Sequence, residues 1–113
     1  MSFSGIGVDL VEIKRFAKAN SAIGTRFISN VFTKHEETYC RAFKDAAPHF
    51  AGTFAAKEAA CKAFGGAHAL NTFEIRRTGS GKPEVWKNKK KLTSLAISIS
   101  HDGAYAVAVC IAI

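Results

Sequence analysis

The last nine residues of the chain, Tyr105 to Ile113, carry no charged side chain. Large apolar residues alternate there with alanine and cysteine, and this period of two residues predicts a β-strand. A strand with one face in water normally carries polar residues on that face, and this segment has none. We therefore expect both faces to be covered. The cover for the second face could be the chain's own helices or a neighbouring subunit.

Several other segments also have strand character. The expected strands are 3–10, 72–77, 84–86 and 95–100. Asp102–Gly103 is typical of a hairpin turn, so segment 95–100 should pair with the final strand. Asp9 is expected at the end of the first strand, after two glycines that would leave open space around the backbone. The lysine-rich segment 87–91 is expected to be a solvated loop or a sheet edge.

The middle of the chain has a helical period instead. The expected helices are 11–18, 33–43 and 48–64. Thr33 and Glu36 have the spacing of a capping box, Pro48 suits the first turn of a long helix, and Gly65–Gly66 would end it. The apolar stripe of the long helix consists of Phe50, Phe54, Cys61 and Phe64. An early strand, a helical middle and a final antiparallel sheet predict an α+β fold, in one small domain spanning residues 1–113.

Composition narrows the class of protein. The 113 residues are 48% hydrophobic, which is enough for one compact core. No segment approaches the roughly 20 apolar residues of a membrane span, and we find no secretory signal, so a soluble cytoplasmic protein is expected. The net charge of +7 should attract an anionic partner: nucleic acid, a membrane face, an acidic protein or a phosphorylated cofactor.

Four polar residues are candidates for chemistry. They are Asp9, Glu58, Lys62 and His101. Each also has a structural explanation: Asp9 could cap the helix that follows it, and Glu58 and Lys62 could form a surface ion pair. A lone histidine at a strand end, such as His101, is usually a surface residue. The alanines around Glu58, however, would keep space clear for a bulky ligand. Two carboxylates are a typical protein share of a magnesium site, because this ion keeps waters and binds substrate phosphates.

Four motifs, in order along the chain, resemble one known family. They are residues 5–13 (GIGVDLVEI), 50–65 (FAGTFAAKEAACKAFG), 81–83 (GKP) and 98–101 (SISH). Their order and spacing are similar to those of the holo-acyl-carrier-protein synthases, a family of phosphopantetheinyl transferases. The resemblance covers nearly the whole chain. It implies magnesium-dependent transfer of 4'-phosphopantetheine from coenzyme A to a serine of an apo-acyl carrier protein, in support of fatty acid biosynthesis.

The resemblance also implies roles for single residues. Asp9 and Glu58 match the family's metal ligands, and Lys62 matches a lysine placed for the coenzyme A phosphates. Glu58 and Lys62 would act in catalysis, with Glu58 or a metal-bound water taking the serine proton. His101 and the Gly81–Pro83 segment, with Lys82 and Pro83, match elements near the adenosine bisphosphate end of coenzyme A.

The resemblance further implies partners. The family forms trimers with active sites between subunits, so a homotrimer is expected. Lys14, Arg15 and Lys18 fall on the first helix, where the family binds its acidic carrier protein. This chain departs from the family at Thr53, where many members have an arginine that helps to hold the nucleotide phosphate, and in a shorter segment after Gly66.

A different class, a small basic nucleic-acid-binding domain, would also explain the charge and the lysines of segment 87–91. That alternative leaves Asp9 and Glu58 without a role. It also lacks aromatic residues interleaved with basic ones on a strand face, the pattern on which bases stack. Neither nucleic acid nor a membrane is therefore the expected partner.

Overall fold

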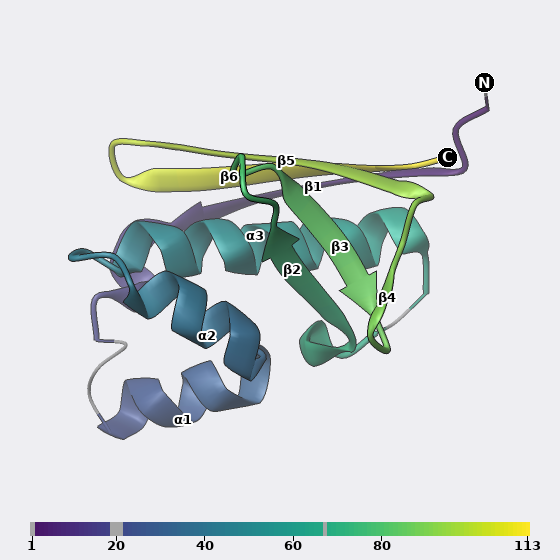
Figure 1. The fold of residues 1–113 in the computed structure, drawn as a ribbon. Helices are drawn as coiled ribbons and strands as arrows, with labels where there is room; N and C mark the ends of the chain where they lie inside the picture. The colour runs from purple at the N-terminus through teal and green to yellow at the C-terminus, as the bar shows by residue number, and fades with distance from the viewer. Residues whose placement is uncertain (1, 19–21, 67) are drawn as a thin grey trace.

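The structure, a computed structural model, describes residues 2–18, 22–66 and 68–113. A long helix lies between two layers (Figure 1): a three-stranded sheet covers one side, and two shorter helices with a second small sheet cover the other. The helices are α1 (Ala22–Val31), α2 (Lys34–Arg41) and the central α3 (Ala47–Phe64), with short 3-10 helices η1 (Ile13–Phe16) and η2 (Leu70–Thr72). The strands are β1 (Gly5–Glu12), β2 (Phe73–Arg77), β3 (Pro83–Lys87), β4 (Lys90–Lys91), β5 (Leu95–Asp102) and β6 (Tyr105–Ala112). The α+β fold and its long helix are confirmed.

The final strand, β6, is the middle of the larger sheet. Both β1 and β5 pair with it in antiparallel register, so that Asp9 lies opposite Ala108, which in turn lies opposite Ile99. The two-residue turn between β5 and β6 is Gly103–Ala104, and Gly103 has the positive φ of 57° that favours glycine there. The predicted hairpin is therefore confirmed, one residue further along than expected.

The two faces of β6 have different surroundings. Ala106, Ala108 and Cys110 are buried on the face that meets α3. On the other face Tyr105 is 48% exposed and Val109 37% exposed, although the sequence predicts cover on both sides. The chain's own helices therefore cover only one face of the sheet. The neighbouring side chains on β1 extend the uncovered apolar face: Ile6, Val8 and Leu10 are all more than half exposed.

The contact between β1 and α3 depends on two glycines. A Cβ atom on Gly5 would overlap the carbonyl oxygen of Ala63, and one on Gly7 would overlap that of Ala59. Backbone therefore lies directly on backbone. The expectation that these glycines leave open space is wrong, because the helix occupies that space.

A buried ion pair joins α3 to the second layer. Lys57 Nζ donates to Glu36 Oε1 at 2.6 Å and to the Phe73 carbonyl oxygen at 2.7 Å. The other oxygen of Glu36 accepts the Ile75 N–H at 2.6 Å, and both side chains are fully buried. Glu36 also completes the predicted capping box with Thr33, which is confirmed. One carboxylate thus connects α2, α3 and β2.

Two parts of the N-terminal half differ from expectation. Strand β1 continues to Glu12, so Val11 belongs to a strand, and only the four residues of η1 are helical where a helix over 11–18 was expected. Helix α1 was not predicted. Its segment contains a glycine and several β-branched residues, which lower helix propensity.

None of the described helices is long and apolar enough to cross a membrane.

We expect Gly7→Ala to lower the free energy of unfolding by about 3 kcal/mol, because the added methyl group would push β1 away from α3. Gly79→Ala is the matched control. A Cβ atom at Gly79 meets nothing within 4 Å, so this variant should unfold like the wild type. Urea denaturation measures both, and equal stability of the two variants would contradict the proposed close contact.

Candidate active site

Asp9 lies within β1, on the strand face that meets α3. Gly5 lies over Ala63 and Gly7 over Ala59, so a step of two residues along the strand corresponds to a step of four residues along the helix. The two steps have similar lengths, because two strand residues rise about 6.6 Å and four helix residues about 6 Å. The next step brings Asp9 over the turn of α3 that contains Ala55 and leads to Glu58. Since β1 continues beyond it, Asp9 is not the helix cap considered as an alternative.

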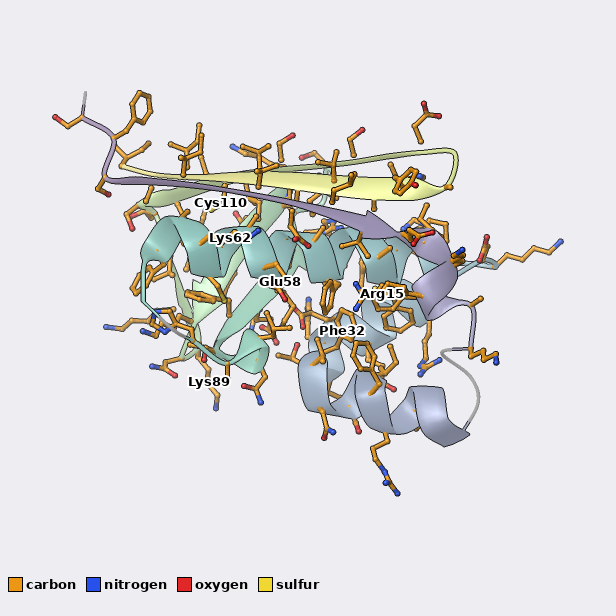
Figure 2. All side chains as sticks on the ribbon, turned by 180° about the vertical axis from the view of Figure 1, so that it is seen from behind. Arg15, Phe32, Glu58, Lys62, Lys89 and Cys110 are labelled. Carbon is orange, nitrogen blue, oxygen red and sulfur yellow. The ribbon has the colours of Figure 1, made fainter. Side chains whose placement is uncertain are left out.

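Lys62 connects α3 to β1. Its Nζ donates to the Val8 carbonyl oxygen at 2.8 Å and lies 3.6 Å from Asp9 Oδ1. Figure 2 shows Lys62 and Glu58 on the face of α3 that lies beside β1. The lysine therefore reaches across to the strand. In the alternative considered above, a surface ion pair, it would bind Glu58 instead. The structure places Lys62 beside Asp9, and Glu58 lies one turn before Lys62 on the same face of α3.

The environment of Asp9 favours a cation beside it. Partial burial raises the pKa of this carboxyl group above its usual value, against the lowering effect of Lys62 and, more weakly, of Arg15. A half-buried carboxylate with this balance gains from further positive charge. Within the described residues no group of three or more His, Cys, Asp or Glu side chains could hold a metal ion. Two carboxylates nevertheless fit magnesium, which takes few protein ligands and binds waters and phosphates as well.

The alanines near Glu58 have another role than the one expected. Ala51, Ala55 and Ala59 are completely buried, because the sheet lies on this side of α3. Small side chains here let the sheet approach the helix closely. They do not keep a surface clear for a ligand, and the expectation that they do is wrong.

The other predicted binding residues lie elsewhere in the protomer. His101 is exposed near the end of β5, two strands away from β1 in the sheet. Lys82 and Pro83 lie where the β2–β3 turn enters β3, and they line a cavity of about 270 Å³ between the two sheets. A single chain does not bring these residues to Asp9 and Glu58.

The basic residues after β1 are only partly on a helix. Lys14 and Arg15 lie on η1, while Lys18 follows it, so the expected placement of all three on one helix is wrong. Lys14 Nζ lies 3.3 Å from Glu12 Oε2. The Lys14 side chain is largely exposed, and that of Glu12 is about half exposed. The Arg15 guanidinium lies over the Phe54 ring, 5.1 Å from its centroid, and Figure 2 shows Arg15 below the head of the β1 arrow.

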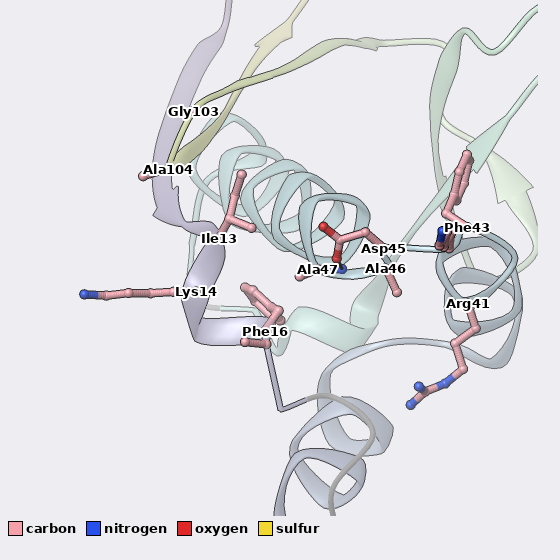
Figure 3. A pocket seen from close by; sticks show the side chains of 12 residues that line it. Ile13, Lys14, Phe16, Arg41, Phe43, Asp45, Ala46, Ala47, Gly103 and Ala104 are labelled. Atoms are coloured by element: carbon pink, nitrogen blue, oxygen red, sulfur yellow. Dashed lines mark hydrogen bonds between the residues drawn. The ribbon is translucent and has the colours of Figure 1, made fainter.

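A cavity of about 750 Å³ opens at the same end of the molecule (Figure 3). It lies between η1, the α2–α3 connection and the β5–β6 turn. Lys14, Arg41 and Phe43 are among its lining residues, and the Lys14 side chain extends away from the others in Figure 3. Its volume is in the range of a small-molecule site.

Position 53 supplies no cationic side chain to this end of the molecule, because the residue there is Thr53. Thr53 is 1% exposed, and its hydroxyl lies 3.6 Å from Cys40 Sγ, with either group able to donate. Burial raises the pKa of the Cys40 thiol to about 11. Both side chains therefore belong to the interior between α2 and α3.

Two groups of residues were not predicted from the sequence. Lys57 falls within the apolar stripe of α3, between Phe54 and Cys61, and that spacing could have indicated a buried lysine. His49, on α3, lies near His101, and Arg77, on β2, lies close enough to His49 to lower its pKa. No spacing rule relates these two residues, because the fold alone brings their elements together.

A family model described as the 4'-phosphopantetheinyl transferase superfamily matches residues 5–110. Curated relatives agree with it. The chain is 40% identical to the holo-[acyl-carrier-protein] synthase of Geotalea daltonii, with 95% of each sequence covered. It is 42% identical to that of Protochlamydia amoebophila, with 92% of this chain and 93% of the relative covered.

Solved structures point the same way. A holo-(acyl-carrier-protein) synthase from Bacillus anthracis, in complex with CoA (3',5'-ADP), has a TM-score of 0.81 and 30% identity, and covers 97% of this chain and 96% of its own. The synthase of Helicobacter pylori, in complex with coenzyme A, has a TM-score of 0.79 and 28% identity, with 96% and 99% covered. The fold, the motifs and these similarities agree throughout, and the chain belongs to the holo-[acyl-carrier-protein] synthases of the 4'-phosphopantetheinyl transferase superfamily.

Proposed function

We propose that this enzyme transfers 4'-phosphopantetheine from coenzyme A to a serine of an apo-acyl carrier protein with the help of magnesium, and so supports fatty acid biosynthesis. The observation that carries the proposal is the ion pair of Lys62 with Asp9 where β1 lies on α3, with Glu58 one turn before Lys62 on the same helix face. Two carboxylates and an ammonium group suit a phosphate ligand that shares a divalent cation with the protein.

In the proposed reaction, the serine oxygen bonds to the phosphorus that carries pantetheine. The bond from this phosphorus to the bridging oxygen breaks, and the electron pair leaves with adenosine 3',5'-bisphosphate. Asp9 and Glu58 would hold magnesium, which when bound neutralises negative charge on the pyrophosphate. Lys62 stabilises charge that develops on the phosphate oxygens, and its bond to Val8 fixes its position. Glu58 is the proposed acceptor of the serine proton.

The direct experiment mixes the protein with an apo-carrier protein, coenzyme A and magnesium and follows the carrier's mass. The carrier should gain one phosphopantetheine group, and chelation of the metal should prevent this. Asp9→Ala and Glu58→Ala should each slow transfer by about a hundredfold or more without unfolding the protein. Glu58→Gln should do the same, because it keeps the shape and loses the charge. Glu74→Gln, which removes a carboxylate on β2, is the control. Near wild-type transfer by either alanine variant would refute the metal assignment.

We also propose a homotrimer with active sites between subunits. The uncovered face of β1 and β6 supports an assembly, because Ile6, Val8 and Leu10 are more than half exposed there. A neighbouring subunit could also bring His101 or Lys82 to the carboxylates, which one chain does not do.

Light scattering should therefore give three times the 12.1 kDa chain mass. Val109→Lys should dissociate the assembly, because it puts a charge into the proposed contact. A monomer mass for the wild type would refute the assembly, whereas a dimer would refute only the threefold symmetry.

The proposed carrier-binding surface is the basic region around η1, formed by Lys14, Arg15 and Lys18. Carrier proteins of this kind are acidic, and opposite charges mainly raise the rate of encounter. Because salt shortens the range of such charges, from about 10 Å at 0.1 M to about 3 Å at 1 M, binding here should weaken as salt rises.

Arg15→Glu should therefore raise the Michaelis constant for the carrier by about tenfold at low salt and leave coenzyme A affinity nearly unchanged. Lys14→Glu should have a milder effect. Lys89→Glu, the same charge change in the β3–β4 turn, is the control. Calorimetry of coenzyme A binding separates the alternatives. Equal losses of affinity for coenzyme A and for the carrier would mean that η1 serves the nucleotide. An unchanged Michaelis constant for the carrier would mean that the docking surface lies elsewhere.

A further inference from the structure

After Phe54, the buried surface of α3 is formed almost entirely by small side chains. Its buried residues from that point on are Ala55, Ala56, Lys57, Ala59, Ala60, Cys61 and Ala63. Within residues 55–64, all of which the structure describes, Lys57 is the only buried side chain larger than cysteine. The proposed reaction gives Lys57 no role, although it directly precedes Glu58 in the sequence.

Contact with β1 leaves the rotation of α3 about its own axis undetermined. Gly5 and Gly7 place the strand backbone against the helix backbone, which sets the distance between the two elements and their register. Because glycine has no side chain, neither residue interlocks with the helix in a way that would resist its turning. Helix α3 lies between two layers (Figure 1), so a smooth helix there could turn slightly without leaving either layer. The rotation is therefore set elsewhere.

Lys57 supplies directional contacts on the side of α3 away from β1. An α-helix turns about 100° per residue, so Lys57 points about 160° away from Ala59, which lies under β1. Its Nζ donates to Glu36 Oε1 at 2.6 Å and to the Phe73 carbonyl oxygen at 2.7 Å. Hydrogen bonds weaken steeply when their angles change, whereas apolar packing such as that of Phe54 has little directional preference. Lys57 is thus the contact that resists rotation in this half of the helix.

We propose that Lys57 is a positioning residue, whose hydrogen bonds set the rotation of α3 and hold Glu58 at the correct distance from Asp9. This inference rests on the proposed function. The side chains of a helix extend about 5 to 6 Å from its axis, so a rotation of about 10° moves a carboxylate by about 1 Å. A displacement of that size can slow a reaction between positioned groups by about a hundredfold. Glu36 belongs to the same arrangement, because it orients the lysine.

The test separates positioning from stability. Lys57→Met alone would leave Glu36 buried without a partner and could unfold the protein. The main variant is therefore Lys57→Met combined with Glu36→Gln, which removes both charges and keeps side chains of similar size. Replacing a buried ion pair by uncharged residues of similar volume is often neutral for stability. Leu95→Ala is the control, because it removes buried volume from β5, in the sheet on the opposite side of α3, and so lowers stability without changing the pair.

The variants are compared with the wild type at a temperature at which circular dichroism shows folded protein. With coenzyme A present, the double variant should bind Mn²⁺ about tenfold more weakly, as measured from the electron paramagnetic resonance signal of free Mn²⁺. It should also transfer phosphopantetheine about a hundredfold more slowly. The Michaelis constant for the carrier should change little, because the basic side chains of η1 are exposed. Leu95→Ala should be less stable than the wild type and keep its Mn²⁺ affinity.

Glu36→Asp keeps both charges and shortens the carboxylate side chain by one methylene group. It should give a smaller loss of Mn²⁺ affinity of the same kind, and it takes the place of the double variant if that protein is unfolded.

A folded double variant with wild-type Mn²⁺ affinity would overturn the inference. Equal losses in Leu95→Ala would do so too, because the effect would then follow stability. Transfer by the wild type is measured separately. If the wild type transfers nothing, the proposed function fails and this inference with it. If the wild type transfers and the double variant matches it, this inference alone fails.

Discussion

The contact of β1 with α3 determines the position of every residue in the candidate site. Because Gly5 and Gly7 have no side chains, the strand backbone lies directly on the carbonyl oxygens of Ala63 and Ala59. This approach fixes the register between strand and helix. It brings Asp9 beside the turn that carries Glu58 and lets Lys62 reach Val8. Any larger residue at the two glycines would move one carboxylate relative to the other.

The opposite side of α3 is fixed by a different interaction. Burial lowers the pKa of Lys57, and Glu36 opposes that effect as its ion-pair partner. Since the same carboxylate also accepts N–H groups from Thr33 and Ile75, the pair is well supplied with hydrogen bonds. Removing either partner would leave an uncompensated buried charge, so arrangements of the elements that separate the two side chains are disfavoured. Helix α3 is thus held from both sides, and Glu58 and Lys62 occupy a face with little freedom to shift.

Periodicity and capping signals predicted most of the fold. The hairpin of β5 and β6, the capping box at Thr33 and the long helix ending at Gly65 all follow from local patterns. Asp9, Glu58 and Lys62 could be proposed from residue type and family motifs. The close packing at Gly7 could not, because a glycine in a strand fits open space and tight contact equally well. The meeting of His49 with Arg77 likewise depends on tertiary packing of α3 and β2, which no local pattern reports.

The central claim is that β1 and α3 together form one divalent-cation site. It can be tested with Mn²⁺, a paramagnetic substitute for magnesium, added in small amounts to the isotope-labelled protein with coenzyme A. The account predicts that amide signals around Asp9 and Glu58 broaden first in nuclear magnetic resonance spectra, and that Asp9→Asn or Glu58→Gln removes this effect. Broadening centred on other residues, or unchanged broadening in both variants, would contradict it.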